Sequence, residues 1–220
     1  MKDGVLVVVS GFSGAGKGTI VSELLRRHGD KLSLSVSATT RAPREGERDG
    51  VDYFFVTPER FREMIERDEF VEYAQFVNHS YGTPKAYVTE QLSAGKNVIL
   101  EIEMQGALQI RKKYPDTVLI FVSTPSAGIL KERLTGRGTE SAEVVADRLS
   151  QANQDATYMP QYDYLVINDD LDTAVEAVYR VISAVQRGEQ EAVSELRMAE
   201  NIPFTERITR ELKGFLKGDI

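Results

Sequence analysis

The sequence predicts an α/β protein in which helices flank a parallel core sheet. Apolar, β-branched runs alternate along the chain with segments whose apolar residues recur at helical spacing. Most of these runs lack the polar alternation that marks a strand with one face in water. A parallel sheet covered by helices on both faces accounts for both observations.

The alternation begins at the N-terminus. Val5–Ser10 is a β-branched run and is expected to form a buried strand, which a helical stripe follows from Gly18 to Arg27. Leu32–Ser37 is a further short strand. Residues 38–50 are rich in arginine, proline and glycine, and this composition predicts a polar loop.

The next segment interrupts the rhythm with several short strands, and we expect an inserted subdomain there. Its expected strands are Tyr53–Val56 and Phe70–Phe76, separated by a helix that ends near Arg67. The Thr-Pro pairs at 57–58 and 83–84 match an N-cap followed by proline at the first helical position. The second pair is expected to begin a helix that runs to about residue 94.

Regular alternation returns in the second half of the chain. The buried strands expected here are Asn97–Glu103, Thr117–Ser123 and Tyr164–Ile167. The expected helices run over 105–114, from a third Thr-Pro pair at 124–125 to about 136, from Ser141 to about 158, and from 172 to 187. The last 30 or so residues are charged and weakly periodic, which predicts either a surface helix or a loose tail.

Composition excludes several classes of protein. The 220 residues carry a formal net charge of −7, which argues against a protein that coats nucleic acid. The absence of cysteine excludes disulfides and thiolate metal sites, and two histidines are too few for a histidine-based zinc site. No apolar run is long enough to span a bilayer, and the N-terminus lacks the apolar region of a signal peptide. We therefore expect a cytoplasmic protein with neither a nucleic acid nor a membrane as partner.

A glycine-rich turn between the first strand and the first helix matches the pattern G-x-x-x-x-G-K. Its glycines allow successive backbone N–H groups to point inward at phosphate oxygens, and the helix N-terminus adds positive potential. Lys17 is expected to bridge the β- and γ-phosphates. A plain glycine-rich turn is the alternative, but the flanking strand and helix favour phosphate binding. The residues concerned are Gly11, Phe12, Ser13, Gly14, Ala15, Gly16, Lys17, Gly18 and Thr19.

This loop departs from the usual pattern at one position. Gly18 stands where phosphate-binding loops of this type carry serine or threonine, so the usual hydroxyl ligand for magnesium is missing. Thr19 is expected to take over a phosphate contact. Mg²⁺ releases its water reluctantly, so we expect phosphates and water to hold the ion.

Seven further segments, taken in order, resemble the signature sequences of the guanylate kinase family. They are SVSATTRAPREGE at 35–47, GVDYFF at 50–55, EFVEYA at 69–74, YGT at 81–83, LEIEMQG at 100–106, RLTGRG at 133–138 and VINDD at 166–170. The resemblance extends over about residues 4–187. It implies a P-loop nucleoside kinase fold and an enzyme that transfers the γ-phosphate of ATP to GMP, and to dGMP, with Mg²⁺.

The resemblance also implies how this single domain of residues 1–220 is divided. The core comprises residues 1–36, 88–125 and 158–187. The GMP-binding region is 37–87, and a helical lid spans 126–157. Residues 188–220 form a C-terminal extension.

Eight residues are implied to bind GMP: Ser37, Arg41, Arg44, Tyr53, Glu72, Tyr81, Thr83 and Glu103. Guanidinium forks bind phosphate in a bidentate way, so Arg41 and Arg44 are expected to clamp the GMP phosphate, with two tyrosine hydroxyls assisting. Guanine presents N1–H and an amino group side by side, which one carboxylate, that of Glu72, can accept. Taken by their spacing alone, the arginines also fit a solvated surface patch, and Glu72 an exposed strand carboxylate.

The remaining assignments concern ATP and catalysis. Glu101 and Glu103 alternate on one strand and therefore share a face. The resemblance places Glu103 at the guanine or ribose and Glu101 beside magnesium-bound water, although the family often has aspartate at both positions. Lid closure excludes water that would otherwise accept the phosphoryl group. The residues implied to meet ATP beyond the loop are Arg133, Arg137 and Asn168, and those implied in catalysis are Lys17, Arg41, Arg137 and Arg148.

Two other functions remain open at this point. A kinase of the same fold acting on another phosphorylated acceptor, such as a sugar phosphate, is disfavoured by the pairing of Ser37 with Glu72. A non-catalytic guanylate-kinase-like binding module is disfavoured because Lys17 and the glycines of the loop are present.

Overall fold

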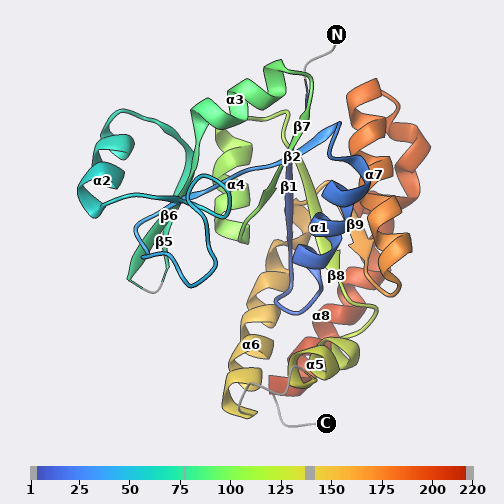
Figure 1. The fold of residues 1–220 in the computed structure, drawn as a ribbon. Helices are drawn as coiled ribbons and strands as arrows, with labels where there is room; N and C mark the ends of the chain where they lie inside the picture. Colours follow the sequence, from blue (N-terminus) through green and yellow to red (C-terminus); the bar gives the residue numbers. More distant parts are fainter. Residues whose placement is uncertain (1–3, 77, 137–141, 217–220) are drawn as a thin grey trace.

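The computed structural model describes residues 4–76, 78–136 and 142–216. Its core is a five-stranded, fully parallel sheet with the strand order β2-β7-β1-β8-β9, seen edge-on at the centre of Figure 1. The strands are β1 (Leu6–Gly11), β2 (Leu32–Leu34), β7 (Asn97–Glu101), β8 (Val118–Ser123) and β9 (Tyr164–Ile167). The predicted α/β class and parallel core sheet are therefore confirmed.

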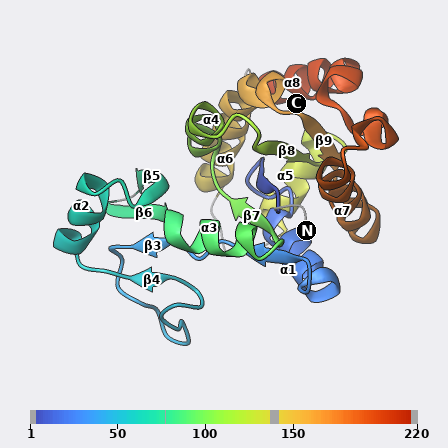
Figure 2. The ribbon, with the colours of Figure 1, turned by 90° about the horizontal axis from the view of Figure 1, so that it is seen from above.

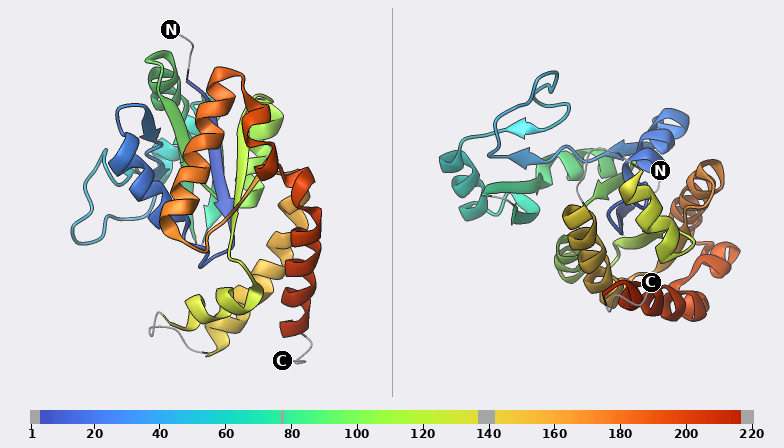
Figure 3. Two further views of the ribbon diagram at one scale, coloured as in Figure 1. Left: turned by 90° about the vertical axis from the view of Figure 1, so that its right-hand side faces the viewer. Right: turned by 90° about the horizontal axis from the view of Figure 1, so that it is seen from below.

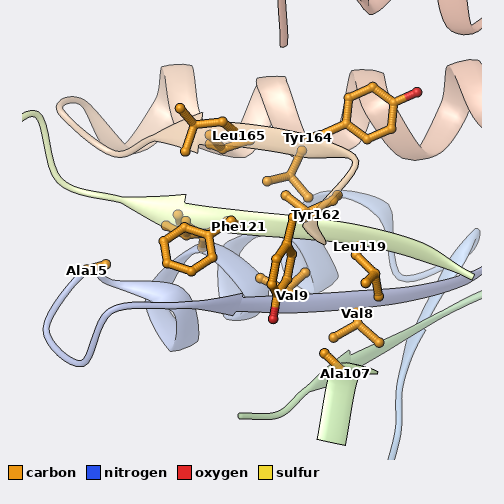
Figure 4. Packing of buried hydrophobic residues seen from close by; sticks show 14 of the residues in the cluster. Val8, Val9, Ala15, Ala107, Leu119, Phe121, Tyr162, Tyr164 and Leu165 are labelled. Atoms are coloured by element: carbon orange, nitrogen blue, oxygen red, sulfur yellow. The ribbon is translucent and has the colours of Figure 1, made fainter. Parts of the chain in front are cut away.

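Helices cover both faces of this sheet. α1 (Lys17–His28) and α7 (Leu171–Arg187) lie on one face and α4 (Met104–Lys113) on the other, while α3 (Lys85–Ser93) packs beside β7 (Figure 1). The central strands β1 and β8 are buried along their whole length. Figure 4 shows the packing around Phe121 and Tyr162, whose rings meet edge to face at 5.2 Å. This core fixes the strand ends at which the candidate site lies.

A second, smaller sheet projects to one side of the core (Figure 2). Its strands are β3 (Ala38–Thr39), β4 (Phe54–Phe55), β5 (Phe70–Phe76) and β6 (His79–Pro84), in the order β4-β3-β6-β5. β3 and β4 run parallel, and β6 is antiparallel to both β3 and β5. With α2 (Pro58–Glu66) it encloses a small apolar cluster of its own, formed by Ala38, Phe61, Met64 and Phe70.

Two helices, α5 (Ala127–Thr135) and α6 (Ala142–Asp155), extend beyond the carboxyl ends of the core strands. The 3₁₀ segment η1 (Ala156–Gln161) then leads from α6 to the start of β9. The chain ends in η2 (Gln190–Leu196), η3 (Met198–Asn201) and α8 (Ile202–Leu216), and α8 runs alongside α6 (Figure 3). Val193, Met198, Ile208 and Leu212 are buried there. The alternative of a loose tail is therefore wrong, because the sparse apolar residues of this segment suffice to join it to the core.

Several local predictions need correction. The loop predicted at 38–50 begins with β3, which has only two residues and pairs with strands far along the chain. β6, which pairs with β5 as a hairpin, was not predicted. Thr83 does not cap α3, since its hydroxyl donates to Glu72 instead. The N-cap of α5 is Ser126 and not the Thr-Pro pair before it.

The strand predicted to reach Glu103 ends at Glu101, and Glu103 is the N-cap residue of α4. The cap predicted at Thr57 is confirmed, with Thr57 Oγ1 accepting from Arg60 N at 3.1 Å. The cap predicted at Ser141 lies outside the described residues. Within the described ranges, no helix combines the length and the apolar character needed to cross a membrane.

Candidate active site

The glycine-rich turn lies where β1 ends and α1 begins, and its backbone needs glycine. Gly14 and Gly16 both have φ of 89°, in the left-handed region. Space is also restricted, because a Cβ placed on Gly14 would lie 2.9 Å from a Leu134 methyl carbon, and one on Gly16 would lie 2.4 Å from Asn168 Nδ2. Conformation and packing therefore both exclude larger residues at these two positions.

The lysine of this turn lies across its own loop. Lys17 Nζ donates to Gly11 O at 2.7 Å and to Phe12 O at 3.1 Å. The loop is held from behind by Asn168, which is 6% exposed and whose Nδ2 donates to Ala15 O at 2.7 Å. The result is a braced backbone cradle with an ammonium group at its mouth, the arrangement that phosphate binding requires.

A carboxylate lies beside the departure from the usual loop pattern. A Cβ placed on Gly18 would lie 3.6 Å from Glu101 Oε1, in ordinary van der Waals contact. Desolvation raises the pKa of Glu101, the positive charge of Lys17 lowers it, and Glu103 raises it. Glu101, Glu103 and Lys17 therefore share one electrostatic environment, and Glu101 supplies oxygen atoms near the position of the missing hydroxyl.

The loop after β3 holds a guanidinium in a fixed orientation. Arg41 donates to Glu47 Oε2 at 3.0 Å and to Glu47 Oε1 at 2.8 Å, and also to Ala42 O at 2.8 Å. The Arg41 side chain is 13% exposed, and its guanidinium carbon lies 5.3 Å from the centre of the Tyr53 ring. Arg44 N donates to the same carboxylate at 2.7 Å. Glu47 therefore ties together the two arginines predicted to bind one phosphate.

The charges and hydroxyls of this loop lie together. The hydrogen bond from Arg41 is the largest cause of the lowered pKa of Glu47, and the same pair raises the pKa of Arg41. The rings of Tyr53 and Tyr81 meet edge to face at 6.1 Å. The structure therefore brings Arg41, Tyr53 and Tyr81 into one group, with Arg44 exposed at its rim.

Glu72 is a buried carboxylate, 6% exposed, on β5. Its Oε1 accepts the Thr83 hydroxyl at 2.7 Å, and its Oε2 would lie 3.4 Å from a Cβ placed on Gly106 of α4. Desolvation raises its pKa, and hydrogen bonds from Thr83 oppose that shift. The alternative of an exposed strand carboxylate is therefore wrong: Glu72 lies at the junction between the small sheet and the core. Ser37 is half-buried, and its carbonyl accepts Phe54 N at 2.9 Å.

One of the two described lid arginines reaches the turn. Arg148 of α6 approaches Ser13, with Nη1 3.3 Å from Ser13 Oγ. Arg133 is half-buried near the end of α5. Arg137, assigned to both ATP binding and catalysis, lies outside the described residues.

The sequence did not single out two acidic residues at the site. Glu47 stands six residues after Arg41 in a loop with proline and glycine. The opposite charges of the two residues are the one feature of the sequence that could have predicted their ion pair. Asp155 ends α6, is 6% exposed and accepts Gln151 Nε2 at 2.9 Å. Desolvation raises its pKa, Glu103 raises it further, and Lys17 lowers it. Nothing in the sequence around Asp155 distinguishes it from a solvated helix residue.

Comparison with known proteins agrees with this geometry. The family model described as guanylate kinase matches residues 3–185. A guanylate kinase of Clostridioides difficile is 52% identical over 184 residues, covering 84% of this chain and 89% of the relative. One from Streptococcus thermophilus is 51% identical over 181 residues, covering 82% of this chain and 87% of the relative.

A solved structure shows the same likeness in three dimensions. The crystal structure of guanylate kinase from Anaplasma phagocytophilum matches with a TM-score of 0.66 at 29% identity, covering 84% of this chain and 88% of that one. The braced glycine turn, the buried Glu72 and the paired arginine loop all fall within the matched residues. The chain belongs to the guanylate kinase family.

Proposed function

We propose that this chain transfers the γ-phosphate of ATP to GMP, and to dGMP, giving ADP and the corresponding nucleoside diphosphate. The observation that carries the proposal is the burial of Glu72 next to Thr83, in a chain whose β1 ends in a lysine-bearing phosphate cradle. A buried carboxylate suits the paired N1–H and amino donors of guanine. A sugar phosphate offers no such adjacent pair of N–H donors to match the carboxylate.

ATP binds at the turn of residues 11–19. Its backbone N–H groups and the N-terminus of α1 hold the phosphates, and Lys17 leaves the carbonyls of Gly11 and Phe12 to follow the transferred group. Thr19 is exposed at the start of α1 and adds a hydroxyl. Asn168 belongs to the ATP site through its hold on Ala15.

GMP binds at the small sheet. Arg41 and Arg44 hold its phosphate, assisted by the hydroxyls of Tyr53 and Tyr81. Glu72 accepts guanine N1–H and the amino group, with contacts from Ser37, Thr83 and Glu103 around the base and ribose. Discrimination follows because adenine has an acceptor where guanine has N1–H, which leaves a buried carboxylate facing a lone pair.

Residues 37–87 and 126–157 move relative to the core and bring both substrates together. Arg133, Arg137 and Arg148 then neutralise the phosphates, and Arg148 already lies at the turn through Ser13. Closure excludes water from the transferred group. Lys17, Arg41, Arg137 and Arg148 carry the charge stabilisation that phosphoryl transfer needs.

The residues present fit a magnesium ion that travels with ATP. Glu101 offers oxygen atoms, which Mg²⁺ prefers, beside Gly18 where the loop has no hydroxyl. We propose that Glu101 would hold the ion through water. When bound, the ion neutralises charge on the β- and γ-phosphates. We further propose that the protein works in the cytoplasm.

Turnover with a panel of acceptors tests the proposal. ADP release is measured with GMP, dGMP, AMP, UMP and a sugar phosphate at equal concentration. GMP should give the highest kcat/KM, by about 10⁴-fold over AMP. Comparable turnover with AMP would refute the role of Glu72 as the guanine reader, and no turnover with any acceptor would refute the enzyme.

A further inference from the structure

The C-terminal helix reaches the lid although it lies outside the family match, which ends at residue 185. α8 packs against α5, α6 and η1 (Figure 3). Ile208 and Leu212 on its apolar side are fully buried, at 0% exposure. The C-terminal helix is therefore packed against the predicted lid.

Two polar side chains of α8 hold the connection between β8 and α5. Glu211 Oε2 accepts Ala127 N, at the first residue of α5, at 2.9 Å. Arg207 Nη2 donates to Pro125 O at 2.8 Å, and Arg207 Nη1 donates to Glu211 Oε1 at 2.9 Å. A backbone donor and a backbone acceptor two residues apart are thus held by one ion pair.

This attachment replaces part of the ordinary capping of α5. The first N–H groups of a helix have no partner within the helix. Ser126 takes one of them, with its hydroxyl accepting Ile129 N at 3.2 Å, and Glu211 takes that of Ala127 from another part of the chain. A carboxylate at a helix N-terminus also interacts favourably with the helix dipole. The position of α5 therefore depends on α8 as well as on its own cap.

α5 in turn forms a wall of the phosphate cradle. Leu130 and Leu134 are fully buried on it. A Cβ placed on Gly14 would lie 2.9 Å from one Leu134 methyl carbon and 3.5 Å from a Leu130 methyl carbon. A shift of α5 therefore changes the space behind the backbone that binds ATP phosphates.

We propose that Glu211 and Arg207 are positioning residues for ATP, acting through α5 on Gly14. The proposal rests on the proposed function only in taking residues 11–19 as the ATP site. It assigns the C-terminal extension a role on the donor side of the reaction and none on the acceptor side.

Calorimetric titration of the full chain with ATP, without GMP, tests this. Glu211→Ala should raise the Kd for ATP by about 2- to 30-fold, the range seen when residues that touch no ligand are altered. The KM for GMP at saturating ATP should stay unchanged. Glu211→Gln keeps a carbonyl acceptor for Ala127 N and should restore most of the affinity for ATP. Arg207→Ala should raise the Kd for ATP, as Glu211→Ala does.

Glu206→Ala is the matched control, because Glu206 is exposed on the same helix, and it should bind ATP as the unaltered chain does. A lowered Tm with an unchanged Kd for ATP would overturn the proposal, since α8 would then only stabilise the fold. Tighter ATP binding by Glu211→Ala would also overturn it, because α8 would then restrain the lid. If the unaltered chain binds ATP but does not phosphorylate GMP, the proposed function fails while this inference stands.

Discussion

The proposed donor and acceptor sites are both expected to bind phosphate, but they are built from different parts of the chain. At the donor site the backbone of residues 11–19 forms the cradle, fixed by the buried strand β1 and by Asn168. At the acceptor site the phosphate is expected to be bound by side chains, on a loop whose residues are mostly exposed. Arg41 is held there by Glu47 and by the ring of Tyr53.

Because the two sites are built differently, substitutions should affect the binding of each substrate in different ways. A backbone cradle changes only when its packing changes, so most substitutions near it should act through Gly14, Gly16 or their neighbours. A clamp made of ion pairs can be altered one side chain at a time, and it is more sensitive to salt because its charges are partly in water. Substitutions near the cradle should therefore change the KM for ATP, and substitutions in the clamp should change the KM for GMP.

The largest effect on kcat is expected at Lys17, whose side chain carries the positive charge of the donor loop. Lys17→Ala should lower kcat by about 10²- to 10³-fold or more, because a positioned charge on the transferred group is lost. GMP binding, measured by calorimetry, should remain nearly intact because Lys17 lies on the donor loop. A variant that retains its activity would refute the role of the loop in phosphoryl transfer.

Glu72 should give the largest effect on the acceptor side. Glu72→Gln should raise the KM for GMP by about 10- to 100-fold, the cost of losing hydrogen bonds to a charged group. Turnover with AMP should improve relative to GMP, since the amide offers both a donor and an acceptor. Steady-state kinetics with both nucleotides measures the change, and unaltered GMP kinetics would remove Glu72 from the site.

The same residue should make GMP binding depend on pH. Guanine needs the ionised carboxylate as a double acceptor, and burial raises the pKa of Glu72 above its ordinary value of 4.5. Affinity for GMP should therefore be full above that raised pKa and fall as the pH drops through it. Glu72→Gln is the control, because it keeps the titration of the GMP phosphate and loses that of the carboxyl; an identical pH profile in both would contradict the assignment.

The two sites also differ in how much of them the sequence predicted. The donor loop was predicted from its motif because its neighbours along the chain, β1 and α1, supply its context. Arg41, Tyr53 and Tyr81 were assigned only by resemblance, since pairing between β3, β4 and β6 joins them and such short strands leave no periodic signal. Asp155 and the bond from Glu211 to Ala127 could not be foreseen, because both depend on the packing of segments far apart in sequence.

A smaller effect is expected at Glu47, which holds the two arginines of the acceptor clamp, Arg41 and Arg44. Glu47→Gln should raise the KM for GMP by about 3- to 10-fold, because the ion pair that orients Arg41 is lost and pairs that are partly in water contribute little each. The KM for ATP should not change. Glu45→Gln, two residues away and exposed, is the matched control. A lower KM for GMP would show instead that Glu47 competes with the phosphate for Arg41.

The smallest effect is expected at Gly18, where the donor loop has room that it lacks two residues earlier. Gly18→Ser places its Cβ 3.6 Å from Glu101 Oε1 within a helix, so the Tm should hold or rise slightly and the KM for ATP should change by less than about 2-fold. Gly16→Ser would place its Cβ 2.4 Å from Asn168 Nδ2 on a backbone with φ of 89°. It should abolish ATP binding, as measured by calorimetric titration. Because the added hydroxyl of Gly18→Ser lies beside Glu101, half-maximal activity should need less Mg²⁺. If Gly18→Ser and Gly16→Ser weakened ATP binding equally, tight packing of the backbone at Gly16 would not be what shapes the donor site.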